Sequence, residues 1–300
     1  MDSRPESVNK LRTFLESKPD FPFYALIGHP VGHSHSPLIH NHALKKAGSS
    51  ARYIALDTTG DDVAWLGQLL SHPHFLGANV TIPHKQRIID LLDRTEPKAT
   101  SVGAVNTVKP ENGVLTGYNT DIRGAEASIK EYALRIMGRP AVIFGTGGAA
   151  RAYAAAVQVA GINQVYVISR NPEISRWPDR FGKTSVKISG YLNLPDLLSG
   201  AGLIINTTPL GMSPNLDESP VSEILAPLLK EKVCLDAIYN PLKTKFLKLA
   251  EKAGASATIS GLTMFVEQAA ASYYIWTGKP FPKEEAKELI INASKNDIPR

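Results

Sequence analysis

The stretch AVIFGTGGAARAYAAAVQVAG, residues 141–161, decides the fold of this chain. It begins with an apolar, strand-like run and continues, after three glycines, into an alanine-rich run typical of a helix. Between the two runs, Gly145 permits a tight turn, Gly147 allows the backbone to approach a pyrophosphate, and Ala150 lets the helix pack on the strand. The helix N-terminus adds N–H groups and a positive dipole that attract an anion. The stretch therefore predicts a dinucleotide-binding unit of the Rossmann type.

The residues at the end of the next strand-like run, 164–169, indicate which dinucleotide binds. NAD-binding units usually place Asp or Glu about 20 residues beyond the glycines, where the carboxylate binds the ribose 2′-hydroxyl. Here the run ends in Ser169, Arg170 and Asn171, without an acid. An arginine can pair with a 2′-phosphate, which a carboxylate would repel. NADP is therefore the expected cofactor, while Glu173 close by keeps NAD possible.

Around this unit, strand-like runs alternate with helix-like runs along the chain. In the second half we expect strands at 141–144, 164–169, 203–206, 232–237 and 256–259, and helices at 148–160, 221–230 and 243–253. In the first half we expect strands at 23–28, 52–57 and 75–82, a hairpin of 104–108 and 114–118, and helices at 33–48, 61–71, 122–137 and from Pro83 onward. Such alternation predicts an α/β protein with mainly parallel sheets.

A length of 300 residues suits about two domains. We expect one domain over residues 1–121 and a Rossmann domain over residues 122–261. Two more helices, expected at 262–277 and 283–294, complete the first domain as part of residues 262–300.

Composition narrows the class of protein. Hydrophobic residues make up 43% and charged residues 20%, which is typical of a globular chain with a packed core. No apolar run approaches the roughly 18 residues of a membrane span, so no membrane partner is expected. The net charge of +5 is dispersed, which argues against nucleic-acid binding. The single cysteine, Cys234, cannot form an internal disulfide, and with the polar N-terminus it predicts a cytoplasmic protein.

Four polar clusters mark the first domain, and all of them follow strands or lie in loops. They are GHPVGHSHSP at 28–37, GANVTIPHK at 77–85, GAVNT at 103–107 and GYNTD at 117–121. Ligands of open α/β sheets bind beyond the carboxyl ends of the strands, where all four clusters can meet. The histidines of 33–42 lack the spacing of a zinc site, so we expect no metal. We expect His84 to be a hydrogen-bonded imidazole at the edge of its loop, with a catalytic role as the alternative.

The motifs HSxSP, NVTxPxK, GAVNT, GxNTD, GxGGAAR, NTTPLGM and GLxMxxEQ occur here in one order. In this the chain resembles the shikimate dehydrogenase family, which includes quinate/shikimate dehydrogenases, over about residues 23–277. The resemblance implies two α/β domains with a cleft between them. It also implies reversible, NADP-linked oxidation of shikimate to 3-dehydroshikimate. One departure is that Asn-Arg-Thr, frequent in the family after the second cofactor strand, is replaced by Ser169-Arg170-Asn171.

The resemblance also implies roles for individual residues. Ser34 and Ser36 would bind the substrate carboxylate, and Lys85 and Asp121 would be the catalytic pair. The ring hydroxyls would be held by Thr81, Asn106, Tyr239 and Gln268. Pyrophosphate would lie on Gly145, Gly147, Gly148 and Ala149, the adenosine ribose among Ser169, Arg170 and Asn171, and the nicotinamide by Ala237 and Gly261.

The residue types suit this chemistry. Hydride reduction of a ketone leaves an alkoxide, and the Lys85 ammonium can donate the proton it needs and accept it in the reverse direction. Asp121 would favour the charged form of Lys85. Hydroxyl and amide side chains suit a polyol acid, because each ring hydroxyl needs a directed partner.

Three alternatives stay open. A quinate dehydrogenase using NAD or NADP would share the fold and the catalytic pair. A regulator that binds quinate or shikimate without turnover is a rival of another class. A tetrahydrofolate-linked dehydrogenase has a similar layout, but the HSxSP loop argues against it. The partner is thus expected to be a small molecule, and the chain a monomer or a homodimer.

Overall fold

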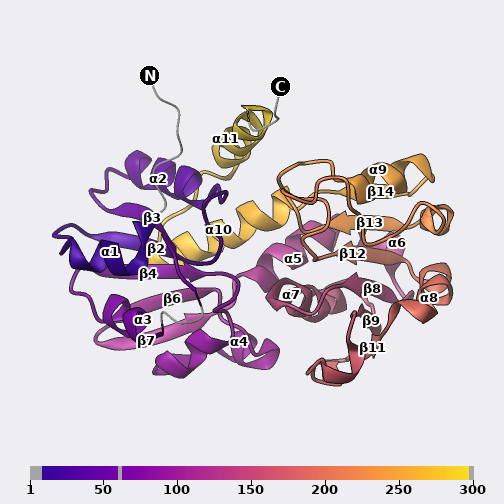
Figure 1. Ribbon diagram of the computed structural model, residues 1–300, viewed down its shortest axis with the longest axis horizontal. Coiled ribbons are helices and arrows are strands. Elements are labelled where there is room, and N and C mark those ends of the chain that lie inside the picture. Colours follow the sequence, from indigo (N-terminus) through magenta and orange to yellow (C-terminus); the bar gives the residue numbers. More distant parts are fainter. Residues whose placement is uncertain (1–8, 60–62, 297–300) are drawn as a thin grey trace. The chain divides into compact units, whose positions relative to one another are not determined.

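The computed structural model describes residues 9–59 and 63–296, and these form two compact units. One unit comprises the described residues up to Thr120 together with Ala269–Ala293. The other comprises Asp121–Gln268 and the last described residues. Figure 1 labels most helices and strands of both units.

The first unit is built on a seven-stranded sheet with the order β1-β3-β2-β4-β6-β7-β5. In chain order the strands are β1 Asn9–Lys10, β2 Phe23–Gly28, β3 Arg52–Asp57, β4 Phe75–Val80, β5 Arg94–Thr95, β6 Thr107–Glu111 and β7 Val114–Tyr118. The pairs β1–β3, β3–β2, β2–β4 and β5–β7 are parallel, whereas β4–β6 and β6–β7 are antiparallel. All six residues of β2 are buried, as expected for a central parallel strand covered on both faces.

Helices and short turns connect these strands. They are α1 Leu11–Glu16, α2 Ser36–Lys46, α3 Val63–Leu70, the 3₁₀ turn η1 Arg87–Leu91 and α4 Pro97–Val102. From the end of the chain, α10 Leu262–Thr277 and α11 Lys283–Asn296 follow, and the division between the units falls within α10.

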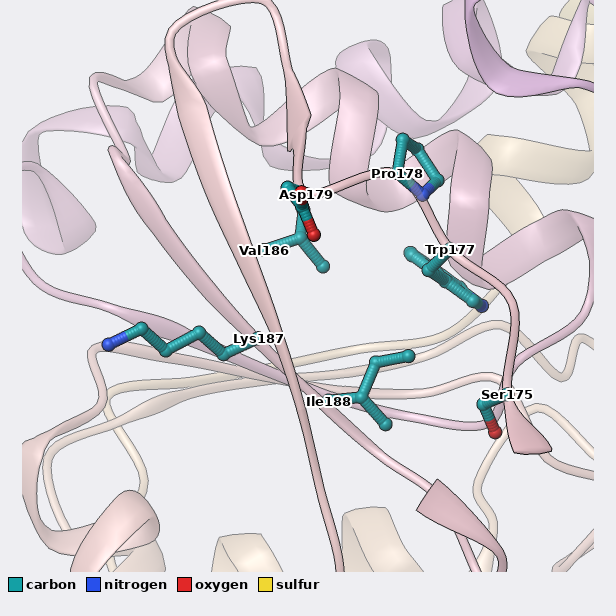
Figure 2. A pocket seen from close by; sticks show the side chains of 7 residues that line it. All are labelled: Ser175, Trp177, Pro178, Asp179, Val186, Lys187 and Ile188. Carbon is teal, nitrogen blue, oxygen red and sulfur yellow. The ribbon is translucent and has the colours of Figure 1, made fainter. Parts of the chain in front are cut away.

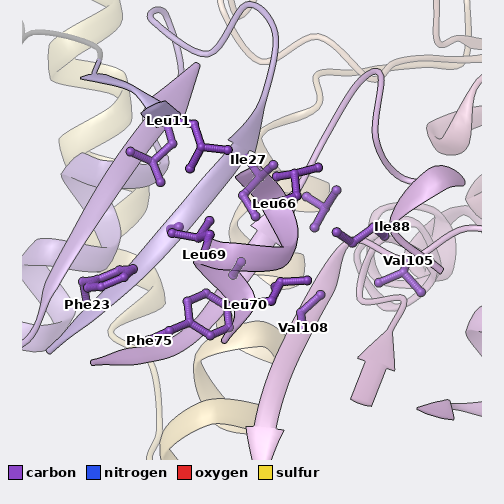
Figure 3. Close-up of a cluster of buried hydrophobic side chains, with 14 of the residues drawn as sticks. Leu11, Phe23, Ile27, Leu66, Leu69, Leu70, Phe75, Ile88, Val105 and Val108 are labelled. Carbon is purple, nitrogen blue, oxygen red and sulfur yellow. The ribbon is translucent and has the colours of Figure 1, made fainter. Parts of the chain in front are cut away.

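The core of the first unit lies between its sheet and the helices α1 and α3. Figure 3 shows Phe23 and Phe75 beside Leu69 in this cluster of buried side chains. The Phe23 and Phe75 rings meet edge to face with centroids 6.0 Å apart, and Phe14 of α1 meets Phe23 at 5.0 Å. Such aromatic pairs add to the free energy gained by removing apolar area from water. The core holds the strands in place, so their carboxyl ends can present the polar loops.

The second unit is built on a second seven-stranded sheet, with the order β10-β11-β9-β8-β12-β13-β14. Its strands are β8 Ala141–Phe144, β9 Gln164–Ile168, β10 Arg180–Phe181, β11 Thr184–Ser189, β12 Leu203–Asn206, β13 Val233–Asp236 and β14 Ala257–Ile259. All pairs are parallel except β10–β11. The four residues of each of β8, β12 and β13 are buried, so these apolar runs are central strands.

Some helices of the second unit precede its first strand along the chain, and the others lie between its strands. They are α5 Asp121–Ile129, η2 Lys130–Tyr132, α6 Ala133–Ile136, α7 Gly148–Ala156, η3 Val157–Ala160, η4 Pro172–Ile174, η5 Tyr191–Asn193, α8 Leu194–Gly200, η6 Ala226–Leu229 and α9 Lys245–Lys252. Together with the first unit they confirm the expected α/β class with mainly parallel sheets. No helix in the described ranges is long and apolar enough to cross a membrane.

Four expected helices differ from the structure. The helix expected at 148–160 is α7 followed by the 3₁₀ turn η3. The helix expected from Pro83 is a turn followed by η1, because His84 closes a turn on Thr81. The helix expected at 122–137 breaks into α5, η2 and α6. Near the break, the Ser128 hydroxyl donates to the Ala125 carbonyl, and such bonding competes with the helix. Over 221–230 only η6 forms.

Candidate functional site

The loop after β2 carries the two serines expected to bind a carboxylate. The Ser34 hydroxyl donates to Ser36 Oγ at 3.1 Å and accepts from the Ser36 backbone N–H at 3.2 Å. Ser36 begins α2, and its side chain is only 5% exposed. His29 at the start of the loop pairs with Asp57 at the end of β3. The loop therefore holds two hydroxyls side by side at a helix N-terminus.

The loop after β4 carries Thr81 and Lys85, and hydrogen bonds join it to its neighbours. The Thr81 N–H donates to the carbonyl of Ile27 in β2 at 2.8 Å. The carbonyl of Lys85 accepts from the Val105 N–H, also at 2.8 Å. The Lys85 side chain is half-buried. The segments that carry Lys85 and the GAVNT motif therefore lie directly side by side.

Asn106 is 2% exposed and is held on both sides of its amide. Its Oδ1 accepts from the Thr120 backbone N–H at 2.7 Å, and its Nδ2 donates to Thr120 Oγ1 at 2.9 Å. Thr120 directly precedes Asp121 in the chain. Asn106 thus fixes the path of the backbone that leads to Asp121.

In the first unit, then, the structure brings together the segments that carry Ser34, Ser36, Thr81, Lys85 and Asn106. The link between the first two loops is the His29 N–H, which donates to the Ile82 carbonyl at 2.7 Å. All of these segments follow the carboxyl ends of β2 and β4 or precede β6. This edge of the sheet offers hydroxyls, amides and one ammonium group, which suit a small anionic polyol.

Asp121, the other expected catalytic residue, is described with the second unit. It is the first residue of α5 and is 5% exposed. A carboxylate in the first turn of a helix interacts favourably with the helix dipole. Further along the same helix, a Cβ at Gly124 would lie 2.5 Å from the Met264 carbonyl oxygen, so only glycine lets α5 approach α10 this closely.

The glycine turn between β8 and α7 has the geometry expected of a dinucleotide site. Gly145 has a φ of +104°, and a Cβ there would lie 2.7 Å from Thr207 Oγ1. Gly147 precedes α7 as its N-cap, and a Cβ there would meet nothing within 4 Å. Gly148 and Ala149 form the first turn of α7. The exposed N-terminus of α7 therefore has room for a pyrophosphate, which its N–H groups and dipole would bind.

The loop after β9 holds the residues expected around the adenosine ribose. Ser169 Oγ accepts from the Asn171 N–H at 3.1 Å and lies 2.9 Å from Ser175 Oγ. Ser175 in turn donates to the Asn171 carbonyl at 2.9 Å. Arg170 lies between Ser169 and Asn171 and is exposed. Ser169 and Ser175 thus fix a tight loop from which the Arg170 guanidinium can reach an anion.

A second contact ties this loop to the glycine turn. The Trp177 indole N–H donates to the Thr146 carbonyl at 3.3 Å, and the Arg151 guanidinium of α7 lies 5.1 Å from the Trp177 ring centroid. Arg151 also donates to the Arg176 carbonyl. Figure 2 shows Trp177, Ser175 and Ile188 around a pocket beside β11. Arg151 and Trp177 therefore hold the loop that carries Arg170.

The residues expected near the nicotinamide follow β13, in the case of Ala237, and β14, in the case of Gly261. Asp236 at the end of β13 is fully buried, and burial raises the pKa of its carboxyl group to about 6. It accepts from the Thr244 hydroxyl at 2.6 Å, from Asn206 Nδ2 at 3.1 Å and from the Ile238 N–H at 3.0 Å. Ala237 comes next, and a Cβ at Gly261 would lie 2.1 Å from its carbonyl oxygen.

Tyr239 and Gln268 are both held by Phe265 of α10. The Tyr239 ring stacks on the Phe265 ring with centroids 4.0 Å apart, and Gln268 Nε2 donates to the Phe265 carbonyl at 2.8 Å. The two residues expected to hold ring hydroxyls thus share one anchor in the second unit.

Sequence reasoning missed several residues that shape the site. Arg151 and Trp177 support the Arg170 loop, Asp236 supports the Ala237 loop, and Asn79 and Ser272 lie behind Asn106. Arg151 stands one residue beyond Ala150 of the glycine motif, and Asn79 begins NVTIPHK, so motif position could have found these two. Within the described residues, no group of three His, Cys, Asp or Glu is placed to hold a metal ion.

Comparison with known proteins identifies the family to which the chain belongs. Residues 26–108 match the model of the shikimate dehydrogenase substrate binding domain, and residues 261–291 match that of the shikimate 5′-dehydrogenase C-terminal domain. The shikimate dehydrogenase (NADP(+)) of Methanocaldococcus jannaschii is 40% identical over 276 residues, which are 89% of this chain and 95% of that protein.

Solved structures agree with these matches. The shikimate 5-dehydrogenase of Thermus thermophilus in complex with NADP(H) and shikimate is 32% identical, with a TM-score of 0.77 over 91% of this chain and 100% of that one. A quinate dehydrogenase from Corynebacterium glutamicum in complex with NAD is 26% identical, with a TM-score of 0.79 over 91% of this chain and 100% of that one. On its fold, its motifs and these relatives, the chain belongs to the shikimate dehydrogenase family.

Proposed function

We propose that this protein is an NADP-dependent shikimate dehydrogenase, which transfers hydride reversibly between NADP(H) and the shikimate/3-dehydroshikimate pair. One observation carries the proposal: each unit presents its half of the required groups at the carboxyl ends of its strands. The first unit presents two paired serine hydroxyls, Lys85 and Asn106 on adjoining segments. The second presents a glycine turn and an open helix N-terminus for the dinucleotide.

Ser34 and Ser36 bind the substrate carboxylate in this proposal. Their hydroxyls lie 3.1 Å apart at the start of α2, where the helix dipole favours an anion. Thr81, Asn106, Tyr239 and Gln268 bind the ring hydroxyls. Directed hydrogen bonds of this kind discriminate strongly, because a ligand that lacks one hydroxyl leaves a buried polar group without a partner.

Lys85 and Asp121 carry out the proton transfer. NADP supplies the hydride acceptor for alcohol oxidation when it is bound. In the reverse direction the Lys85 ammonium donates a proton to the alkoxide oxygen, and in alcohol oxidation its amine accepts that proton. Asp121 is proposed to hold the Lys85 ammonium group in place. Replacement of Lys85 by Ala removes the proton donor, and we expect it to lower kcat by roughly 100-fold or more.

NADP is the proposed cofactor, with NAD as the weaker alternative. Gly145, Gly147, Gly148 and Ala149 cradle the pyrophosphate, and Ser169, Arg170 and Asn171 surround the adenosine ribose. Arg170 is exposed on the loop that follows β9. No carboxylate lies at the end of this strand, and the Arg170 guanidinium can pair with a 2′-phosphate. Ala237 and Gly261 lie beside the nicotinamide.

At the level of the whole chain, residues 1–121 with 262–300 act as the substrate domain, and residues 122–261 as the NADP domain. We propose a cytoplasmic enzyme, because its cofactor is a soluble dinucleotide and its single cysteine forms no disulfide. The assembly is a monomer or a homodimer.

A quinate dehydrogenase is the second candidate. The similarity to a quinate dehydrogenase with a TM-score of 0.79 favours it, while the identity to that protein, 26%, is lower than to the shikimate dehydrogenases. A regulator that binds ligand without turnover is the third.

One experiment separates these candidates. The purified protein is mixed with shikimate or quinate, each with NADP⁺ or NAD⁺, and the absorbance of the reduced nicotinamide gives kcat/KM for the four pairs. We expect the highest value for shikimate with NADP⁺. A higher value for quinate would identify a quinate dehydrogenase, and ligand binding without turnover in any pair would identify a regulator.

A further inference from the structure

A buried cluster of hydroxyl and amide groups lies behind Asn106 in the first unit. It joins strands β3, β4 and β6 and the loop before α5 to helix α10. The members, each at most 6% exposed, are Tyr53, Asn79, Asn106, Thr107, Thr120 and Ser272. Buried polar groups are costly unless every one of them is hydrogen-bonded, so a cluster of this size requires an ordered arrangement.

Ser272 of α10 stands at the centre of the cluster. Its Oγ lies 2.9 Å from Thr107 Oγ1 and 3.0 Å from Thr120 Oγ1. The two threonine hydroxyls are 3.2 Å apart, so the three oxygens form a triangle. Asn79 Nδ2 donates to Ser272 Oγ at 2.9 Å. The Ser272 hydroxyl thus accepts a hydrogen bond from Asn79 and donates one to a threonine hydroxyl.

The direction of these hydrogen bonds is set from one end. The Tyr53 hydroxyl donates to Asn79 Oδ1 at 2.7 Å, so the Asn79 amide must turn its Nδ2 towards the hydroxyl triangle. At the other end, Asn106 Oδ1 accepts from the Thr107 hydroxyl at 3.0 Å and from the Thr120 N–H at 2.7 Å. The cluster therefore supplies donors to Asn106 Oδ1, and at Thr120 Oγ1, 2.9 Å away, it accepts one N–H of Asn106 Nδ2, so it fixes the orientation of the whole amide.

We propose that Ser272 is a positioning residue, which through the hydroxyl triangle holds Asn106 so that Asn106 meets the substrate as a hydrogen-bond donor. This inference rests on the proposed function, because it assumes that Asn106 binds a ring oxygen. The matching ligand group is an oxygen lone pair, on a hydroxyl or a ketone. Without Ser272 Oγ, Asn79 Nδ2 and the threonine hydroxyls lose a shared hydrogen-bond partner. The remaining groups can then rearrange their hydrogen bonds, so that the side-chain oxygen of Asn106 is no longer held.

The test is Ser272→Ala, which removes one oxygen atom and leaves α10 with a better helix former. We expect KM for shikimate to rise roughly three- to tenfold, as for the loss of one orienting hydrogen bond, while KM for NADP⁺ stays within about twofold. The matched control is Thr184→Val, since Thr184 is also fully buried and its hydroxyl donates to the Ile162 carbonyl at 2.8 Å from β11. This control should lower the melting temperature and leave KM for shikimate unchanged.

A second variant, Thr107→Val, removes another corner of the triangle and serves if Ser272→Ala does not fold. If both variants act through Asn106, the double variant should raise KM no more than the stronger single variant, because residues of one network are not additive. Unchanged KM in the single variants, or effects that multiply, would overturn the inference.

Calorimetric titration with shikimate, of the wild type and of Ser272→Ala, distinguishes failure of this inference from failure of the proposed function. If the wild type binds and oxidises shikimate while Ser272→Ala binds it equally tightly, only the role of Ser272 is wrong. If the wild type does not bind shikimate, the proposed function is wrong and the inference falls with it.

Discussion

His84 Nε2 lies 2.8 Å from the backbone carbonyl oxygen of Thr58, and the His84 side chain is fully buried. A carbonyl oxygen can only accept, so Nε2 carries the proton. The sequence predicts a hydrogen-bonded His84 imidazole at the edge of its loop. The hydrogen bond is present, but the ring is fully buried and joins the loop after β4 to the residue that follows β3. Because His84 directly precedes Lys85, this contact fixes the backbone from which the proposed proton donor extends.

Replacement of His84 by Phe keeps a ring of similar size but removes the hydrogen bond to Thr58. We expect kcat to fall roughly tenfold, because a small displacement of Lys85 misaligns the proton transfer. KM for NADP⁺ should change little, since the cofactor residues lie in the other unit. Steady-state kinetics with shikimate varied at saturating NADP⁺ gives kcat, and a second series with NADP⁺ varied gives its KM. His74→Phe, at a half-buried histidine away from the loop, is the control, and equal kcat in the two variants would disprove the role.

Arg170 decides between the two cofactors in our proposal. Replacement of Arg170 by Gln removes the cation that pairs with the 2′-phosphate, so KM for NADP⁺ should rise roughly 10- to 100-fold, and KM for NAD⁺, which lacks that phosphate, should stay within about twofold. Arg180→Gln, at an exposed arginine of β10, should change neither value. Equal loss with both dinucleotides would mean that Arg170 supports the loop and does not select the cofactor.

Asp236 makes the protein less stable as its carboxyl group ionises. Burial raises the pKa of Asp236 to about 6, against 3.8 in an unfolded chain. Between these values the folded protein binds a proton that the unfolded chain has lost. The free energy of unfolding therefore falls as pH rises from about 4 to 6, by about 3 kcal/mol in total from this group.

Asp236→Asn removes this titration and keeps one oxygen, which can accept from the Ile238 N–H, while the new amide nitrogen faces the Thr244 hydroxyl. Urea unfolding of both proteins at about pH 4, 5, 6 and 7 should show that the free energy of unfolding of the variant, minus that of the wild type, rises by about 3 kcal/mol across this range. This difference cancels the other groups that titrate here in both proteins, His40 among them. Parallel curves for the two proteins would show that Asp236 keeps an ordinary pKa in the folded state.

The fold could be predicted largely from local patterns. The apolar runs of β2, β3, β7, β8 and β12 have the expected bounds, because each is a continuous or alternating run that ends at a polar or glycine residue or directly before one. The strand β11 was missed, since Thr184–Ser189 mixes polar and apolar residues, and its place beside β9 depends on parallel pairing with distant residues. Pairing across long stretches of chain leaves no local signal.

The residues of the candidate site also include some that local motifs predict and some that only long-range contacts reveal. Motif spacing led to Lys85, Asn106 and the glycine turn, which lie where strands end. Ser272 and Trp177 act through contacts with residues far away in the chain, 165 residues from Ser272 to Thr107 and 31 from Trp177 to Thr146. Nothing in the residues next to either one distinguishes it from a core side chain, so only the folded structure reveals it.

His40 of α2 provides the last prediction, on acid stability. Its ring stacks on Tyr53 with centroids 4.4 Å apart, near Trp276 and Phe281, and neither ring nitrogen has a hydrogen-bond partner within the described part of the chain. Burial in these apolar surroundings lowers the pKa of His40 from 6.5 to about 3. Between these two pH values the unfolded chain binds a proton at His40 and the folded protein does not. The free energy of unfolding should therefore fall as pH falls, by about 1.4 kcal/mol per pH unit from this group.

His40→Phe keeps a ring against Tyr53 and removes the titration. We expect the variant to unfold at higher urea concentration than the wild type at about pH 4.5, and the difference between the two proteins to shrink at about pH 7.5, where His40 is neutral in both states. His74→Phe again serves as the control and should follow the wild type at both pH values. A constant difference between His40→Phe and the wild type at the two pH values would indicate a packing effect and not the loss of a proton-binding group.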